Sequence, residues 1–295
     1  MLASHRRESR MSTALESQSR DQTQPTVVSE LVPYEKRLDQ NSRWALTEGS
    51  VFFEDKGAVQ QAMRRIAKRL DEIGVPYAIV GGMALFQHGF RRFTEDVDIL
   101  VTREGLKTIH ENLEGRGYLP PFTGSKHLRD TELGVKVEFL VSGGYPGDGK
   151  PKPVAFPDPD TVAEVIDGRK YLRLTSLIEL KLASGMSSEQ RAKDLNDIQQ
   201  LIKAAHLPLD LADQLDPYVQ EKYRTLWSLE WPAGRRYLRA WPRESLTPET
   251  LDGLLAEGLV VDANRNADAQ FVFLATTDPQ LAFRYDMPDE SEYRE

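Results

Sequence analysis

Residues 80–100 read Val-Gly-Gly-Met-Ala-Leu-Phe-Gln-His-Gly-Phe-Arg-Arg-Phe-Thr-Glu-Asp-Val-Asp-Ile-Leu. The apolar run Pro76–Val80, which we expect to be a buried strand, ends at Gly81-Gly82 and leads into Met83–Gly89, a predicted turn or two of helix. Glycine lets a backbone approach a phosphate closely, and the N–H groups at the start of a helix point toward it. The stretch therefore predicts a strand, a glycine turn and a helix beside a phosphate site.

Asp96 and Asp98 are the second feature of this stretch. They lie two residues apart in an apolar run that continues to Val101, and alternate side chains on a strand face the same side. Two carboxylates this close repel each other unless a cation lies between them, and such oxygen pairs suit Mg²⁺ bound together with substrate phosphates. The alternative is a solvated strand edge or a turn. The apolar neighbours favour a buried strand, where unpaired carboxylates are costly.

A third carboxylate is expected on a neighbouring strand. The segment Lys126–Val141 is typical of a hairpin, and its second arm places Glu138 between Val137 and Phe139. Glu138 is therefore a candidate third metal ligand. Its alternative is a glutamate on an edge strand that faces water.

The rest of the chain alternates predicted helices and strands, which favours an α/β (α+β) fold with a small mixed β-sheet and flanking helices. We expect helices at 57–74, 105–117, 160–166, 176–185 and 188–205, and a strand at 170–174. The predicted divisions are a disordered or loosely ordered arm (1–45), a core (46–205), a mainly helical C-terminal region (206–286) and an acidic tail (287–295).

Composition excludes several classes of protein. The 295 residues carry a net charge of −8, which does not suit a general nucleic-acid coat but leaves room for a local basic cleft. Cysteine is absent, so there are no disulfides and no thiolate zinc sites. No run approaches the ~18 apolar residues of a membrane span, and no apolar segment follows Arg6, Arg7 and Arg10 as in a secretion signal. We therefore expect a cytoplasmic protein without membrane contact.

The glycine turn and the carboxylate pair resemble a known signature. A strand, Gly81-Gly82, 13 further residues and Asp96-Val-Asp98-Ile resemble the polymerase-β-like nucleotidyltransferase superfamily. More narrowly, Arg92-x-Thr94-x-Asp96-x-Asp98 resembles the bacterial minimal nucleotidyltransferases that include AbiEii-type abortive-infection toxins. The resemblance spans about residues 60–205.

The resemblance implies an enzyme that transfers a nucleoside monophosphate from an NTP to an acceptor hydroxyl. Two Mg²⁺ ions would be held by Asp96, Asp98 and Glu138, one lowering the pKa of the acceptor hydroxyl and the other stabilising the leaving pyrophosphate. The acceptor hydroxyl stays open between an RNA 3′ end, a protein hydroxyl and a small molecule. If the chain is a toxin of this group, tRNA or another RNA is a candidate acceptor and an antitoxin a candidate partner.

The resemblance further assigns residues to the nucleotide. It implies that Lys181 contacts the phosphates and that Asp194 supports catalysis or positioning; the residues expected to bind nucleotide are Gly81, Gly82, Arg92, Thr94, Lys181 and Arg191. Alternatively, Lys181 is a surface lysine, and Arg191 and Asp194 form an ion pair within one helix. Asp197 is expected to be structural.

Three further features of the sequence are a departure from the signature at Met83, an unpaired histidine and a segment with P-loop spacing. Met83 stands where many members have Ser or Thr, which moves phosphate contact onto the backbone and onto Arg92 or Lys181. His88 has no evident partner and is expected to pack. Residues 144–150 match the spacing of a P-loop, but Pro151 follows where Ser or Thr should bind Mg²⁺, so we predict a surface loop that could lie over the site.

The acceptor is the least determined part of the prediction. Residues 224–243 interleave arginines with Trp227, Trp231, Tyr237 and Trp241, which suits either an RNA platform or a cap that packs its aromatic rings. Two other functions stay open, a catalytically silent interaction protein with this fold and a nucleotidyltransferase that modifies an antibiotic. The NTP and the oligomeric state are also left open.

Overall fold

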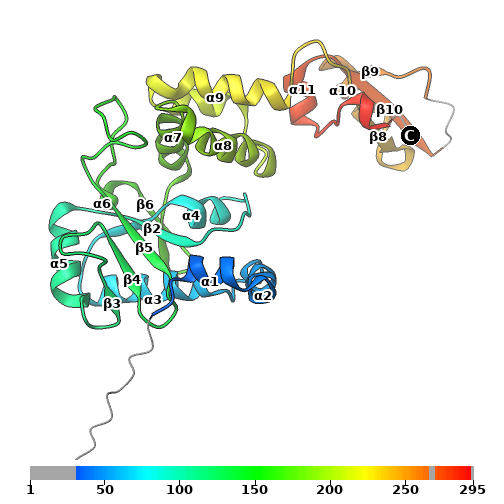
Figure 1. Cartoon of the computed structure of the whole chain (residues 1–295). Helices are drawn as coiled ribbons and strands as arrows, with labels where there is room; N and C mark the ends of the chain where they lie inside the picture. Colours follow the sequence, from blue (N-terminus) through cyan, green and yellow to red (C-terminus); the bar gives the residue numbers. More distant parts are fainter. Residues whose placement is uncertain (1–30, 266–269, 294–295) are drawn as a thin grey trace, which may run out of the picture. The chain divides into compact units, whose positions relative to one another are not determined.

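The computed structural model describes residues 31–265 and 270–293 (Figure 1). Its main sheet has seven strands in the order β3-β4-β5-β2-β1-β7-β6. At the centre, β2 (Asp96–Val101) pairs antiparallel with β1 (Tyr77–Ile79) and parallel with β5 (Lys136–Val141). The register of β2 and β5 places Asp98 opposite Glu138. The mixed sheet with flanking helices confirms the α/β class expected from the sequence.

The other elements of this part follow in chain order. The strands are β3 (Tyr118–Leu119), β4 (His127–Asp130), β6 (Ala163–Ile166) and β7 (Arg169–Leu172). The helices are α1 (Tyr34–Gln40), α2 (Ser42–Phe52), α3 (Ala58–Glu72), α4 (Gly81–Gln87), α5 (Arg103–Leu113), α6 (Pro159–Val162), α7 (Leu174–Gly185), α8 (Ala192–Ala204) and α9 (Pro217–Glu230). The helix expected at 160–166 is therefore one turn, after which the chain enters a strand.

The core forms where the apolar periodicity predicts it. On α3 the buried stripe is Val59, Met63, Ile66, Ala67 and Leu70, which is the predicted face of an amphipathic helix. Helices α3 and α4 both pack against β2, and α5 packs against β5. On β2 the residues between the two aspartates and beyond them are fully buried, so the aspartates are carried on a rigid central strand.

The N-terminal segment differs from its expectation. We expected a loosely ordered arm to residue 45, but α1 and the start of α2 lie within it. Tyr34 is 1% exposed, its N–H donates to the carbonyl of Gly134, and its hydroxyl donates to Glu48. The segment is polar in composition, and its few apolar residues are held by contacts that are distant in sequence. Residues 1–30 of the expected arm lie outside the described residues.

The C-terminal region also differs from the mainly helical expectation. After α9 it forms a three-stranded antiparallel sheet of order β8-β10-β9. Its elements are β8 (Tyr237–Pro242), α10 (Pro248–Ala256), β9 (Val260–Val261), β10 (Phe271–Thr276) and α11 (Pro279–Arg284). They enclose a second apolar core that includes Tyr237, Leu259 and Leu274. The apolar pattern predicts a strand at 270–275, where β10 lies, but β9 has only two residues and the mixed composition of 231–243 gave no strand pattern for β8.

The expected solvated tail is in fact attached to that sheet. The N–H of Leu238 donates to the carbonyl of Pro288, and Asp289 and Glu290 accept from Arg235 and Arg236. Residues 287–293 are therefore held by backbone bonds and ion pairs, and residues 294–295 lie outside the description.

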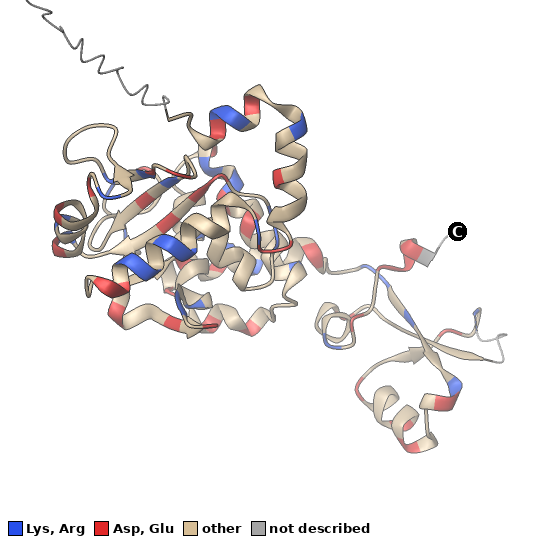
Figure 2. Cartoon of the chain, turned by 90° about the horizontal axis from the view of Figure 1, so that it is seen from below, with Lys and Arg blue, Asp and Glu red and all other residues tan. Residues whose placement is uncertain are grey.

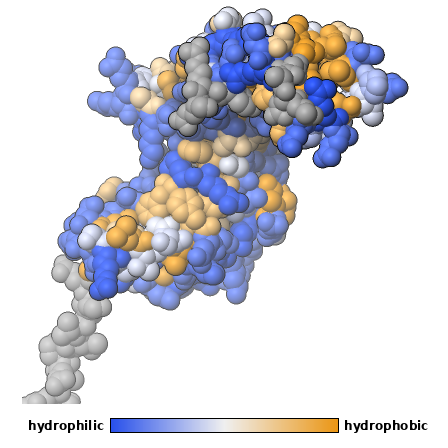
Figure 3. Space-filling model, turned by 90° about the vertical axis from the view of Figure 1, so that its right-hand side faces the viewer, coloured by the Kyte–Doolittle hydropathy of each residue, from blue (hydrophilic) through white to orange (hydrophobic). Residues whose placement is uncertain are grey.

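The face that Figure 3 presents is largely hydrophilic, with apolar areas among the polar ones. Within the described part of the chain, no helix has both the length and the apolar character to cross a membrane.

Candidate active site

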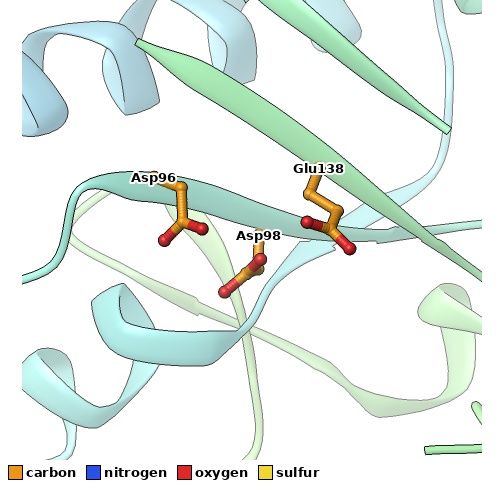
Figure 4. A group of neighbouring side chains, drawn as sticks. All are labelled: Asp96, Asp98 and Glu138. Atoms are coloured by element: carbon orange, nitrogen blue, oxygen red, sulfur yellow. The ribbon is translucent and has the colours of Figure 1, made fainter. Parts of the chain in front are cut away.

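Asp96, Asp98 and Glu138 form one cluster on one side of the sheet (Figure 4). Each offers a carboxylate oxygen, and these oxygens lie within 4.8 Å of one another. The cause is local: Asp96 and Asp98 alternate along β2, and the parallel register sets Glu138 of β5 beside Asp98. The main-chain N–H of Val80 also donates to the carbonyl of Asp98 at 2.9 Å, which ties β1 to this point.

The cluster fits a divalent cation. Mg²⁺ takes oxygen ligands at about 2.1 Å, so the oxygens around it are about 3–4 Å apart. Three carboxylate oxygens within 4.8 Å of one another can reach such an ion with small side-chain rotations. The donor set, three carboxylates with no nitrogen or sulfur, is the hard oxygen set that Mg²⁺ prefers.

Two polar neighbours hold Asp96. The hydroxyl of Thr94 donates to its Oδ1 at 3.0 Å. The ammonium of Lys136 lies 3.3 Å from its Oδ2 and donates at 2.9 Å to Oε2 of Glu138. Burial opposes the charge on Lys136, but Glu138 and Asp96 outweigh it and raise the pKa of the lysine, so the ammonium stays charged.

The negative charge of Asp98 is disfavoured by its surroundings. Burial is the largest cause, followed by the charges of Asp96 and Glu138, and together they raise its pKa to about 7. In the metal-free chain Asp98 therefore binds a proton at pH values where an ordinary aspartate is ionised. A divalent cation would displace that proton, so metal binding and deprotonation are linked.

The Gly-Gly pair is required by close packing at the start of α4. Gly81 has φ +59, and a Cβ there would lie 1.9 Å from Oδ2 of Asp98. At Gly82 a Cβ would lie 2.8 Å from the Cβ of Thr94. The two glycines therefore let the helix start lie directly against the carboxylate strand. The next residue, Met83, is buried in the core and offers no hydroxyl.

Basic and acidic side chains from α7, α8 and the loop before β2 form a second cluster beside the first. Asp197 of α8 is 1% exposed and accepts from Lys181 of α7 at 2.7 Å and from Nη2 of Arg92 at 3.0 Å. Lys181 also donates to Asp194 at 2.6 Å, and Ser184 donates to the other oxygen of Asp194 at 2.6 Å. Burial would raise the pKa of Asp194, but Lys181 and then Ser184 outweigh burial and lower it.

Both clusters line one cavity of about 790 Å³. Gly81, Gly82 and Thr94 line it as well, together with loop residues 142–147 and Gly149. Among the described residues, its charged lining consists of Arg92, Arg103, Lys126, Lys181, Arg191 and Lys193 against Asp96, Asp98, Glu138 and Asp194. The cavity therefore collects six cationic side chains in a chain whose net charge is −8.

The structure brings every residue expected at the site to this cavity. The glycine-rich loop expected at the surface lies at its wall, where the carbonyl of Gly147 accepts from Arg191 at 3.4 Å. His88 lies apart and bonds the carbonyl of Leu172, as expected for a packing histidine.

Sequence reasoning missed Lys136 and the part played by Asp197. Lys136 alternates with Glu138 on β5, so the strand period that indicated Glu138 also placed the lysine on the same face. Asp197 was expected to be structural, and it does hold Arg92 and Lys181 without itself lining the cavity. No pattern in the sequence joins Arg92 to α8.

The arginine-rich segment 224–243 is mostly paired within the protein. Trp227 is 3% exposed and stacks on Trp231. The partners of the arginines are Asp213 for Arg224, Asp289 for Arg235, Asp262 and Glu290 for Arg236, and the carbonyl of Tyr285 for Arg239. This geometry matches the packed cap, the second of the two alternatives for this segment.

No protein-family model matches the sequence, and the search of curated proteins finds no match. Several solved structures are similar. A candidate nucleotidyltransferase from H. pylori is 22% identical with a TM-score of 0.35, covering 65% of this chain and 84% of that one. The antibiotic-resistance factor ANT(2'')-Ia is 14% identical with a TM-score of 0.38, covering 57% and 89%. An antigenic nucleotidyltransferase-like protein from Paracoccidioides brasiliensis is 15% identical with a TM-score of 0.36, covering 57% and 85%. Likeness at this level transfers no activity to this chain.

Proposed function

We propose that this chain is a Mg²⁺-dependent nucleotidyltransferase that transfers a nucleoside monophosphate from an NTP to an acceptor hydroxyl. The cluster of Asp96, Asp98 and Glu138 carries the proposal, because three carboxylates from adjacent strands converge at the wall of a cavity. A purely structural role explains only part of the cluster, because Lys136 pairs with Asp96 and Glu138. Among the described residues no cation forms an ion pair with Asp98, and a third carboxylate this close opposes folding unless a further cation joins it.

The reaction makes one bond and breaks another. The acceptor hydroxyl oxygen bonds to the α-phosphorus of the NTP, the bond from that phosphorus to pyrophosphate breaks, and the hydroxyl proton is released. Mg²⁺ bound at the carboxylates supplies Lewis-acid stabilisation of the phosphate oxygens. Lys181 and Arg191 line the same cavity and would neutralise the triphosphate, and Asp197 fixes the position of Lys181.

We propose further that the acceptor is anionic, with nucleic acid as the leading class. A cationic antibiotic would need acidic side chains in addition to those that hold the metal, and the only other acidic group among the described lining residues, Asp194, is already paired with Lys181. Arg103 at the start of α5 and Lys126 just before β4 line the cavity, and within the described part of the chain neither forms an ion pair, so both are available to an acceptor phosphate. A toxin that modifies tRNA and is restrained by an antitoxin is one form of this proposal.

Label transfer tests the proposal directly. The protein is incubated with each α-³²P-labelled NTP and Mg²⁺, with total tRNA, with an aminoglycoside, or with neither. We expect label on RNA, abolished by EDTA and by Asp96→Asn. Asp71→Asn is a matched control, because Asp71 also pairs with a lysine of this sheet but lies outside the cavity. Label on the aminoglycoside alone would support the antibiotic alternative, and no transfer to any acceptor would support a catalytically silent protein.

A further inference from the structure

Lys136 occupies a defined position in the carboxylate cluster. The parallel register pairs Asp96 with Lys136 and Asp98 with Glu138, so one face of two adjacent strands carries three carboxylates and one ammonium. The ammonium lies 3.3 Å from Asp96 and 2.9 Å from Glu138, between the two strands. It therefore bridges two of the three candidate metal ligands.

The charge balance of this group is unusual for a site that is to hold two divalent ions. Three carboxylates face one ammonium, which leaves two negative charges, the number that a single divalent ion neutralises. Two divalent ions would leave the cluster strongly positive unless phosphate oxygens joined it. Like charges at about 4 Å repel by several kcal/mol at the effective dielectric of a protein surface.

Lys136 is also restrained rather than free in water. Its side chain is 30% exposed, and its ammonium contacts Asp96 of β2 and Glu138 of β5. In the same sheet, Lys170 makes a similar 2.8 Å pair with Asp71, but at a single carboxylate outside the cavity. Lys170 therefore forms an ordinary ion pair, whereas Lys136 lies among the candidate metal ligands.

We propose that Lys136 is a built-in cation that takes one of the cation positions of the cluster, so that the chain without nucleotide holds one divalent ion. With Lys136 and one divalent ion compensating the three carboxylates, binding of a second ion would need the negative charge of NTP phosphates. This inference rests on the proposed function, because it assumes that the carboxylates bind metal. It assigns to Lys136 the roles of holding Asp96 and Glu138 together before metal binds and of weakening nucleotide-free metal binding.

Counting bound Mn²⁺ tests the proposal without using activity. Free Mn²⁺ is measured by electron paramagnetic resonance during titration of the full chain without nucleotide. We expect the wild type to bind one Mn²⁺ ion. Lys136→Met should bind Mn²⁺ about tenfold or more tighter, because a repelling charge is removed. Lys136→Arg keeps that charge and should bind Mn²⁺ like the wild type. Lys170→Met is the matched control and should leave the Mn²⁺ affinity unchanged.

Thermal unfolding gives a second readout. In EDTA, Lys136→Met should unfold at a lower temperature than the wild type, and Mn²⁺ should restore it, whereas any change in Lys170→Met should be the same with and without Mn²⁺. Equal Mn²⁺ affinity in Lys136→Met and the wild type, or two ions bound to the nucleotide-free wild type, would overturn the role of Lys136 while leaving the proposed function standing. A wild type that binds no Mn²⁺ with or without NTP would instead overturn the metal site itself.

Discussion

Asp98 shows how a single residue couples metal binding to stability. Its raised pKa, about 7, means that the folded metal-free chain holds a proton that the unfolded chain releases once the pH passes the ordinary value of an aspartate, about 4. Because the folded state binds more protons in this window, this group lowers the stability of the metal-free chain as the pH rises from about 4 to about 7. Mg²⁺ removes the penalty by replacing the proton.

We predict that Asp98→Asn stabilises the metal-free protein and abolishes its function. At pH 8 in EDTA the free energy of unfolding should rise by about 1–3 kcal/mol, since an uncompensated charge is removed. Added Mg²⁺ should no longer stabilise the variant, and nucleotidyl transfer should fall at least about a hundredfold. Scanning calorimetry at pH 5 and pH 8 measures the first effect, which should be smaller at pH 5. Wild-type activity in the variant would contradict the metal assignment.

The glycine that begins α4 gives a second prediction at this scale. Gly81→Ala places a Cβ 1.9 Å from Oδ2 of Asp98 at a positive φ, so the carboxylate must turn away from the cluster. Gly74→Ala is the matched control, because Gly74 has φ +68 but nothing within 4 Å of the added Cβ. In both variants the free energy of unfolding should fall by about 1–2 kcal/mol, because alanine is strained at a positive φ. Only Gly81→Ala should also lose Mg²⁺ affinity and activity. Isothermal titration calorimetry measures the Mg²⁺ affinity of both variants. Equal affinities would show that the close approach of Gly81 to Asp98 does not matter for metal binding.

At the scale of elements, α7 and α8 position the phosphate side of the cavity. Lys181 on α7 is held between Asp194 and Asp197 on α8, and Arg92, which precedes β2, binds the same Asp197. Gly185 allows the two helices to approach, since a Cβ there would lie 2.5 Å from Leu195. The pairing of these helices therefore carries both a packing role and a charge-positioning role.

Because of this pairing, Lys181→Ala should affect stability as well as nucleotide binding. The residue has a side chain only 12% exposed, and its removal would leave the buried Asp197 with one cation fewer. We predict a stability loss of about 2–4 kcal/mol in addition to a rise in the KM for NTP. Arg191→Ala should raise the KM with a stability change within about 0.5 kcal/mol, because Arg191 is exposed. Urea unfolding and steady-state kinetics on both variants separate the two roles, and an unchanged KM in Arg191→Ala would remove it from the nucleotide site.

At the scale of the whole molecule, acidic and basic residues are both spread over most of the elements. Figure 2 shows acidic and basic residues interspersed over the elements of the chain, consistent with an overall charge of −8. Affinity for nucleic acid depends on cations that are free to meet phosphates. The arginines of 235–243 are largely committed to partners within the protein, whereas the cavity collects cations from several elements. The cavity, and not the C-terminal segment, is therefore where we expect an anionic acceptor to bind.

We predict that Arg103→Ala with Lys126→Ala weakens tRNA binding and makes the log–log salt slope shallower by about 0.7 for each phosphate that is no longer neutralised. Arg235→Ala with Arg236→Ala should leave the slope unchanged and instead destabilise the C-terminal sheet, because the buried Asp262 loses an ion-pair partner. Fluorescence anisotropy over a range of salt concentrations measures the slopes. If the salt slope becomes shallower only in the Arg235 and Arg236 variant, the C-terminal segment and not the cavity binds the acceptor.

The sequence alone determined the parts of this protein that depend on local period. Because side chains alternate along a strand, the sequence was enough to place Asp96 and Asp98 on one face. The spacing of apolar residues was likewise enough to identify the buried side of α3. Strand period also placed Glu138 among apolar neighbours, although it could not say which strand would be adjacent.

Only the tertiary structure decided what depends on contacts distant in sequence. The pairing of β2 with β5 made Glu138 and Lys136 neighbours of the aspartates, and the packing of α7 on α8 joined Lys181 to Asp197. Likewise, Tyr34 is buried by partners far along the chain, and the C-terminal arginines lie beside acidic residues of a segment expected to be free. Local sequence sets side-chain direction, but the partner of a charge is set by chain topology, because an ion pair depends on a few ångströms of separation.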